Sequence, residues 1–219
     1  MNAGVDGGGA TPVGSRRAAR RTQTIEEILG LALEIMGEAG AGSLSYAELA
    51  RRLGVRPPSL YKYFSSVMAI YDELFRRGQR AHRDAVAAAM HEAKPGMDSI
   101  RAGFDAAARW TADQPVLAQL LFWRPIPGFE PSPEAFAPSV EMVGLFRTAL
   151  SQAVDTGELV PAGGSEEALS LLSVLAAGIS SQYMANEPGR RWKESRYLPL
   201  GRAALDMFQA AYGASTSEP

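Results

Sequence analysis

Residues 49–64, LARRLGVRPPSLYKYF, constrain the fold more than any other part of the chain. A short helical pattern ends at Gly54, and glycine adopts turn conformations that other residues resist. Pro57 and Pro58 follow three residues later, and proline is favoured in the first turn of a helix, where its missing N–H would have no partner. The stretch therefore predicts two short helices joined by a tight turn.

Two helix starts upstream extend this pattern. A capping box places Ser or Thr at a helix start and Glu or Gln three residues later, and such boxes occur at Thr24 and at Ser45. The first precedes apolar residues at three- and four-residue spacing, which predicts one apolar helix face ending at Gly40. Together with the helix expected from Pro57 to about Ser65, the pattern predicts three helices in the first third of the chain.

Three short helices with this spacing are typical of a helix-turn-helix, whose second helix enters the major groove of DNA. Ala50 lets the helices approach closely, and the small core beneath is predicted to contain Leu49, Leu53, Val55 and Leu60. The alternative is a generic helical hairpin whose Tyr and Phe side chains are core. Tyr61 and Lys62 lie off the face that Leu60 and Phe64 share, so we expect them to contact DNA. The candidate DNA-binding residues in this region are Ser45, Tyr46, Arg56, Pro57, Ser59, Tyr61, Lys62, Tyr63 and Ser66.

Positive charge is concentrated near the start of the chain, although the net charge is −2. Residues 1–64 hold eight Lys or Arg against six Asp or Glu, and residues 65–219 hold fourteen against eighteen. A basic block follows a glycine-rich leader that we expect to be disordered, and it consists of Arg16, Arg17, Arg20 and Arg21. Such a block is either a solvated tail or an arm that binds phosphates.

Residues 24–74 resemble the DNA-binding domain of TetR-type bacterial transcriptional regulators. The resemblance rests on the leader helix, the Leu-Ala-x-x-Leu-Gly-Val core and the Leu-Tyr-x-x-Phe recognition helix, in that order. Such proteins usually continue with Pro-Ser-Lys, whereas this chain reads Ser65-Ser66-Val67, so a phosphate contact by residue 67 is lost. The resemblance implies a homodimer that binds operator DNA and responds to a small molecule.

The rest of the chain also reads as helices, interrupted at 124–138 by a segment with five prolines that we expect to be a loop. Helices are expected to resume over about 139–156, 165–185 and 196–212. Two stretches, AARWTADQPVLAQLLF and SVLAAGISSQYM, resemble the C-terminal domain type with a Trp-His-Gly signature. Of that signature Gly178 is present, and Ala177 stands where the His would be.

Aromatic and Met side chains flank the proline-rich segment, which leaves room for a cavity that accepts an apolar or aromatic effector. Each such residue could instead be core. The candidate effector-binding residues are Phe104, Trp110, Phe122, Trp123, Phe129, Phe136, Met142, Phe146 and Tyr183. Apolar character wraps around the helix at 165–185, which favours a dimer interface over a buried helix of a monomer. The candidate interface residues are Leu171, Leu175, Gly178, Ile179, Leu205 and Phe208.

Nothing in the sequence supports catalysis or a cofactor. There is no cysteine, His82 and His91 lack the four-residue spacing of paired metal ligands, and we expect both histidines at the surface. Signatures of nucleophilic Ser sites and of phosphate-binding loops are absent. No apolar run reaches the roughly 18 residues of a membrane helix, so a cytoplasmic protein without membrane contact is expected.

The sequence therefore predicts an all-α protein with a basic arm over 1–21, a three-helix helix-turn-helix domain over 22–70 and a helical effector-binding and dimerisation domain over 71–219. The predicted function is a ligand-responsive repressor without metal or cofactor. The alternative is a helical ligand-binding protein or enzyme with a vestigial helix-turn-helix.

Overall fold

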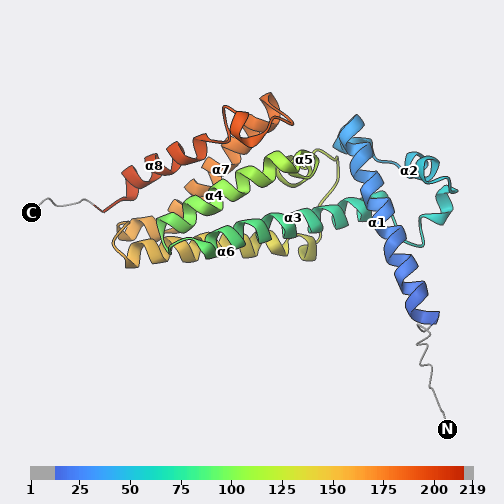
Figure 1. The fold of residues 1–219 in the computed structure, drawn as a ribbon, viewed down its shortest axis with the longest axis horizontal. Helices are drawn as coiled ribbons and strands as arrows, with labels where there is room; N and C mark the ends of the chain where they lie inside the picture. Colours follow the sequence, from blue (N-terminus) through green and yellow to red (C-terminus); the bar gives the residue numbers. More distant parts are fainter. Residues whose placement is uncertain (1–12, 215–219) are drawn as a thin grey trace, which may run out of the picture. The chain divides into compact units, whose positions relative to one another are not determined.

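The structure is a computed structural model that describes residues 13–214 of the chain. Within these residues it contains eight α-helices, four short 3₁₀ turns and no β-strand longer than an isolated bridge, which confirms the all-α prediction. The chain divides into two compact units, Met1–Ile70 and Tyr71–Pro219. The ribbon is drawn in Figure 1.

The first unit is built on α1 (Val13–Ala39) and α2 (Tyr46–Leu53), joined through a 3₁₀ turn at Ala41–Ser43. The apolar face of α1 packs on α2 and on the turn, and Gly40 ends α1 at φ 91°, as the sequence predicted. The buried side chains of this unit are Ile28, Leu29, Ala32, Ile35, Met36, Ala41, Leu44, Leu49, Ala50, Leu60 and Ile70.

The prediction of a disordered arm is wrong for residues 13–21, because they form the first turns of α1. Thr24 does not cap this helix: its hydroxyl donates to the Arg20 carbonyl at 3.0 Å. Ala and Arg are good helix formers, so they extend the amphipathic helix toward the N-terminus. The part of the predicted arm over residues 1–12 lies outside the described residues.

The predicted third helix is instead a 3₁₀ turn at Pro57–Ser59 followed by further turns to residue 63. Bonds between residues three apart tighten it, as when the Leu60 N–H donates to the Pro57 carbonyl at 3.0 Å. A residue that precedes proline is disfavoured in the α conformation, so Pro58 weakens an α-helical start at Pro57. Val55 was expected in the core but is 43% exposed, directly after the left-handed Gly54.

The second unit is a bundle that α3 (Val67–Glu92) enters from the first unit. It continues with α4 (Met97–Asp113), α5 (Pro115–Trp123), α6 (Pro133–Asp155), α7 (Glu166–Asn186) and α8 (Leu200–Tyr212). In this unit α4 is central and contacts α5, α6, α7 and α8. One core cluster of this unit comprises Val86, Met90, Met97, Ile100, Phe104, Ala149, Leu150, Ala153, Leu159, Ala168, Leu169, Leu172, Leu205 and Phe208.

The proline-rich loop is shorter than predicted, because α6 begins at Pro133 and includes Pro138. Ser132 caps the helix by accepting a hydrogen bond from the Ala135 N–H at 3.2 Å. The carboxylate of Asp72 accepts two hydrogen bonds from Ser132, from its N–H at 2.7 Å and its hydroxyl at 2.8 Å. A capped start with proline in the first turn favours helix, so residues 133–138 belong to α6 rather than to the loop.

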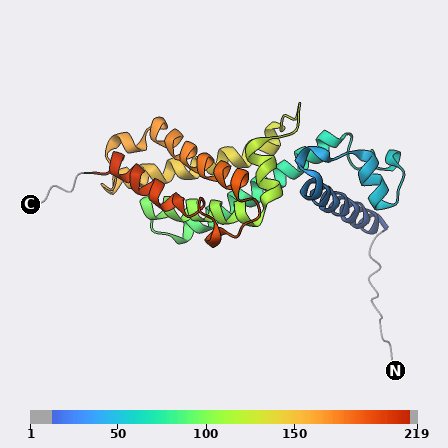
Figure 2. The same cartoon turned by 90° about the horizontal axis from the view of Figure 1, so that it is seen from above.

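α7 packs beside α8, which Figure 2 shows in orange and red. α7 is the one helix in the described part of the chain that is long and apolar enough to cross a membrane, although 28% of that window is buried in the protein. The search for an unbroken apolar run missed it because Ser and Gly residues interrupt the run. These properties alone are weak evidence of a membrane span, since core and interface helices share them.

Candidate DNA interface and ligand cavity

The start and end of α2 are fixed by local hydrogen bonds. The Ser45 hydroxyl accepts a hydrogen bond from the Glu48 N–H at 3.2 Å, as the capping box predicted. At the other end, Gly54 adopts the left-handed conformation at φ 67°, and the Val55 N–H donates to the Ala50 carbonyl at 3.0 Å. These bonds set the point at which the chain turns from α2 into residues 57–64, which we call the reading segment.

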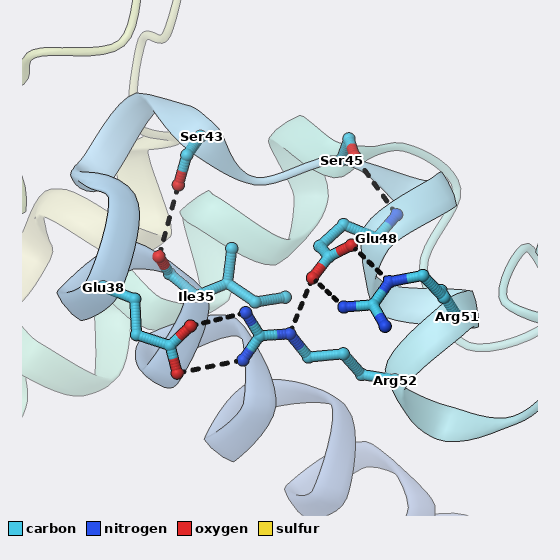
Figure 3. A network of polar contacts seen from close by, with 7 residues as sticks. All are labelled: Ile35, Glu38, Ser43, Ser45, Glu48, Arg51 and Arg52. Carbon is cyan, nitrogen blue, oxygen red and sulfur yellow. Dashed lines mark hydrogen bonds and ion pairs between the residues drawn. The ribbon is translucent and has the colours of Figure 1, made fainter.

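An ion-pair network joins α2 to α1 (Figure 3). Glu48 accepts from Arg51 at 2.7 and 2.8 Å and from Arg52 at 2.7 Å, and Arg52 also donates to Glu38 of α1 at 2.5 and 3.1 Å. Hydrogen bonds from Arg51 and Arg52 lower the pKa of Glu48 to about 2. Both arginines are therefore engaged within the first unit, and Arg52 holds α2 against α1 through Glu38.

The reading segment is anchored by one apolar side chain and presents polar ones. Leu60 is 2% exposed, whereas the neighbouring Tyr61 is 58% exposed and Lys62 is also exposed. The other predicted DNA-binding residues divide by exposure: Ser45, Arg56, Pro57 and Ser66 are exposed, and Tyr46, Ser59 and Tyr63 are half-buried. The Ser66 hydroxyl accepts from the Ala69 N–H at 3.1 Å and so caps α3.

Tyr46 ties α2 to the end of the reading segment. Its hydroxyl donates to the Phe64 carbonyl at 2.6 Å, and its ring meets Tyr61 edge to face with centroids 4.8 Å apart. Burial raises the pKa of Tyr46, which keeps the hydroxyl protonated as a donor. Tyr46 was predicted to contact DNA. In the structure its hydroxyl donates to the backbone carbonyl of Phe64 instead, and this bond holds the segment that carries Tyr61.

Arg21 connects α1 to the same segment. Its guanidinium donates to the Lys62 carbonyl at 2.9 Å and lies 5.5 Å from the centre of the Tyr63 ring. The Lys62 ammonium lies 4.9 Å from the same ring, and a hydrogen bond with the Thr24 side chain lowers the pKa of Tyr63. The basic block and the reading segment therefore form one cationic surface, a connection that sequence spacing did not reveal.

All four arginines of the basic block are exposed on α1. They occupy positions 16, 17, 20 and 21, and because residues four apart on a helix are neighbours, their side chains share one face. This face lies on the helix that also carries the Lys62 contact of Arg21. Exposed guanidinium groups on a rigid helix suit phosphate oxygens, which are the usual partners of Arg on a nucleic acid.

The second unit contains a cavity of about 480 Å³ between α3, α4, α5, α6 and α7. Among the predicted effector-binding residues, those that line it are Phe104, Phe122, Trp123, Phe136, Met142 and Phe146. Phe122 and Trp123 are 38% and 41% exposed, and Arg124 beside them is exposed as well. These exposed residues mark an opening at the end of α5.

Three predicted effector-binding residues do not line the cavity, which corrects the prediction for them. Trp110 is buried and packs on His82 with ring centroids 4.8 Å apart. Phe129 packs against Tyr71 at 5.8 Å, and Tyr183 is fully buried with its hydroxyl donating to the Arg190 carbonyl at 2.8 Å. Aromatic character alone does not distinguish a core side chain from a cavity wall.

His82 was predicted at the surface, but the structure buries it in the cavity wall at 4% exposure. Neither ring nitrogen has a hydrogen-bond partner among the described residues, and the ring packs against Trp110 and, at 5.5 Å, against Phe122. Burial lowers the pKa of this imidazole to about 4, so it is neutral at physiological pH. The sequence signal that could have found it is its place four residues before Val86, a core residue of α3.

Several other polar groups of the cavity wall are engaged within the protein. The Thr111 hydroxyl donates to the Ala107 carbonyl at 2.8 Å, and the Ser173 hydroxyl donates to the Leu169 carbonyl at 3.1 Å. Ser181 accepts from the Trp123 indole at 3.3 Å. Gln79, one helical turn before His82, is 4% exposed and was also missed by the sequence analysis.

An exposed apolar stripe covers the outer face of α7 and α8. On α7, Val174 is 65% exposed, Leu171 is 36% exposed, and Gly178 lies one turn farther on the same face. On α8, Met207 is 72% exposed and Leu200 is 50% exposed. The remaining predicted interface residues lie deeper: Leu175 and Ile179 are half-buried, and Leu205 and Phe208 are each 1% exposed in the core of this unit.

The assignment of Leu205 and Phe208 to a subunit interface is therefore corrected. Both point away from the face of α8 that carries Met207, since α-helical side chains one or two residues apart do not share a face. Leu205 and Phe208 lie on the apolar side of α8, but the spacing of apolar residues does not tell whether that side faces a partner or the chain's own core.

Comparison with known proteins supports these features. The family model described as bacterial regulatory proteins, tetR family, matches residues 28–74. The HTH-type transcriptional regulator Rv1816 of Mycobacterium tuberculosis is 30% identical over 156 residues, which are 67% of this chain and 64% of the relative. The match thus spans somewhat less than two thirds of that relative's length.

Solved structures share the fold over most of the chain. The putative regulatory protein SCO4313 is 25% identical, with a TM-score of 0.72 over 90% of this chain and 98% of its own. The TetR-family regulator PfmR from Thermus thermophilus is 21% identical, with a TM-score of 0.62 over 84% of this chain and 94% of its own. The helical fold is therefore one that these solved proteins share.

Proposed function

We propose that the chain is a DNA-binding transcriptional regulator of the TetR type, a repressor that leaves its operator when a small effector enters the second unit; the match of residues 28–74 to the tetR family model and the similarity to HTH-type regulators support this. The observation that carries the proposal is the pairing of a cationic reading surface in one unit with an apolar cavity in the other.

The reading segment is proposed to enter the major groove. Leu60 fixes the segment from below, Tyr46 fixes its end, and Tyr61 and Lys62 are presented to solvent. A tyrosine offers a hydroxyl and a flat ring to base edges and sugar, whereas a lysine follows phosphates. The exposed arginines of α1 add phosphate contacts beside it.

The effector is proposed to occupy the 480 Å³ cavity. Its volume lies in the usual range for small-molecule sites, and its wall is mostly apolar and aromatic with few polar groups. α3 supplies Gln79 and His82 to the wall and begins at Val67 within the first unit. A ligand that binds better when α3 adopts the DNA-incompetent position would shift the population toward release.

The exposed stripe of Leu171, Val174, Gly178, Leu200 and Met207 is proposed to be the homodimer interface. Contiguous apolar surface on a soluble protein marks an interaction site, and a two-fold dimer would present two reading segments to adjacent half-sites of an operator. This role also accounts for the apolar composition of α7 without a membrane, and we infer a cytoplasmic, non-catalytic protein.

The proposal is tested by incubating the purified protein with fragments of the genomic DNA from which its gene derives and sequencing the retained fragments. We expect a few promoter fragments that share an inverted repeat, bound by dimers. Retention without enrichment of any sequence, at several salt concentrations, would contradict a regulatory role. A Tyr61→Ala variant serves as the matched control because it should retain the fold and lose the enrichment.

A further inference from the structure

The buried imidazole of His82 is not explained by the stability of the protein. A buried polar group without a hydrogen-bond partner destabilises the folded state, because water would have satisfied it in the unfolded chain. Both nitrogens of His82 are in this position, while the hydroxyls of Thr111, Ser173 and Ser181 in the same wall have partners within the protein. An apolar residue of similar size would pack in the same place at lower cost.

His82 belongs to the wall of the cavity, with the rings of Trp110 and Phe122 against its imidazole. Both nitrogens are covered in this conformation, so a ligand would reach them where a flanking side chain such as the 38% exposed Phe122 turns aside. A neutral imidazole offers one donor and one acceptor. A ligand in the cavity is the partner that would use them.

We propose that His82 is the polar anchor of the effector, and that the effector is an uncharged apolar molecule whose hydroxyl group, alcohol or phenol, hydrogen-bonds to the imidazole. This inference rests on the proposed function, since it specifies what the cavity of the second unit accepts. A hydroxyl both donates and accepts, so it can pair with either neutral tautomer of the ring.

The charges around the cavity argue against an ionic ligand. Among the described residues that form the wall, Arg124 is the one that carries a charge, and it lies exposed at the opening with its guanidinium 5.4 Å from the ring centre of Phe136. A carboxylate bound beside His82 would be buried among apolar side chains away from that guanidinium, and an ammonium would meet no carboxylate from these residues. Burial of either ion without a counter-charge is unfavourable.

Metal binding is not a competing explanation for His82. Among the described residues no group of three or more His, Asp or Glu side chains is arranged to hold a metal ion. The nearest polar neighbour along α3 in the wall, Gln79, offers an amide that can form a second hydrogen bond to the same ligand hydroxyl. The two residues lie one helical turn apart.

The proposal is tested with three probes of one shape: 2-naphthol, naphthalene and 2-naphthoate. Binding to the wild-type protein and to His82→Leu, His82→Gln and Thr111→Val is measured by isothermal titration calorimetry, and the melting temperature of each variant is recorded first. Thr111→Val is the matched control, because it removes a hydroxyl of the wall that already donates to Ala107. His82→Gln keeps a donor and an acceptor.

We expect the wild-type protein and Thr111→Val to bind 2-naphthol at least tenfold more tightly than naphthalene or 2-naphthoate. His82→Leu should bind naphthol and naphthalene within about twofold of each other, and His82→Gln should recover part of the difference. Equal binding of naphthol and naphthalene by the wild-type protein would overturn the anchor while leaving the ligand cavity in place. Preference for 2-naphthoate would overturn the uncharged ligand class, and no binding of any probe would overturn both the anchor and the proposed effector site.

Discussion

The two units differ at one buried polar group. In the first unit, the ionised groups between α1 and α2 are bonded to one another through Glu38, Glu48 and Arg52, and the Tyr46 hydroxyl has its partner in the Phe64 carbonyl. In the second unit, His82 is buried without a partner among the described residues, in the wall of a cavity. The first arrangement holds a surface in a fixed shape, and the second leaves a site ready for another molecule.

The largest expected effect comes from truncating Leu60, whose buried side chain anchors the reading segment to the core of the first unit. Leu60→Ala removes a side chain that is 2% exposed, so we expect the free energy of unfolding to fall by about 2–5 kcal/mol and operator binding to fall with it. Urea unfolding followed by circular dichroism measures the change. Val55→Ala is the control, because Val55 is exposed and its truncation should have little effect; equal losses for both variants would remove Leu60 from the core.

A second prediction concerns the pH dependence of the free energy of unfolding that the buried His82 causes. The unfolded chain protonates His82 below about pH 6.5, whereas the folded protein keeps it neutral down to about pH 4. Stability should therefore fall as the pH is lowered through this window, with a contribution from His82 of at most about 1.4 kcal/mol per pH unit.

The measurement is the free energy of unfolding of the wild-type protein and of His82→Leu between pH 4 and pH 8. The variant should be as stable as or more stable than the wild-type protein at pH 7, and its advantage should grow toward pH 4. Parallel pH profiles for the two proteins would show that the imidazole is accessible to water.

The ion-pair network of the first unit gives a smaller effect in a different pH window. The pKa of Glu48 is lowered to about 2 by hydrogen bonds from Arg51 and Arg52, so its contribution is present above the ordinary carboxyl pKa of 4.5 and is lost as the pH falls toward 2. Glu48→Gln should therefore be slightly less stable than wild type near pH 7, and the difference should disappear at low pH. A difference that stays constant from pH 7 to pH 2 would show that ionisation of Glu48 does not matter.

The smallest expected effect concerns Lys62, which we assign to phosphate contact. Lys62→Ala should weaken operator DNA and unrelated DNA alike, and it should reduce the slope of log affinity against log salt by about one unit. Fluorescence anisotropy at several salt concentrations measures both. A loss confined to the operator sequence would assign Lys62 to base recognition instead.

The sequence predicted those elements whose signals are local. The Ser45 cap, the Gly54 turn and the burial of Leu60 follow from short-range hydrogen bonds and side-chain spacing, and the structure contains all three. The early start of α1 was missed because a capping box at Thr24 can also occur within a longer helix. The prolines at 57 and 58 were read as the start of an α-helix, but Pro58 disfavours the α conformation of Pro57, and a 3₁₀ turn forms there.

The cavity was less predictable because its wall is assembled from helices that lie far apart in the sequence. Sequence analysis named six of the residues that line it, together with three aromatic side chains that lie in the core, since both groups have the same composition and spacing. His82 was missed although it stands four residues before the core residue Val86, because spacing along one helix does not tell which polar residue the rest of the fold covers. Which face of α8 points outward depended likewise on packing that periodicity cannot specify.

Titration of one retained operator fragment with the wild-type protein and with two variants tests the central claim most directly. Tyr61→Ala changes the reading surface of the first unit, and Ala108→Leu fills part of the cavity of the second. We predict that Tyr61→Ala weakens operator binding by about 1–3 kcal/mol while leaving the melting temperature unchanged, and that Ala108→Leu leaves operator affinity unchanged. Unchanged operator affinity for Tyr61→Ala, in a protein that remains folded, would contradict the assignment of the reading surface to DNA.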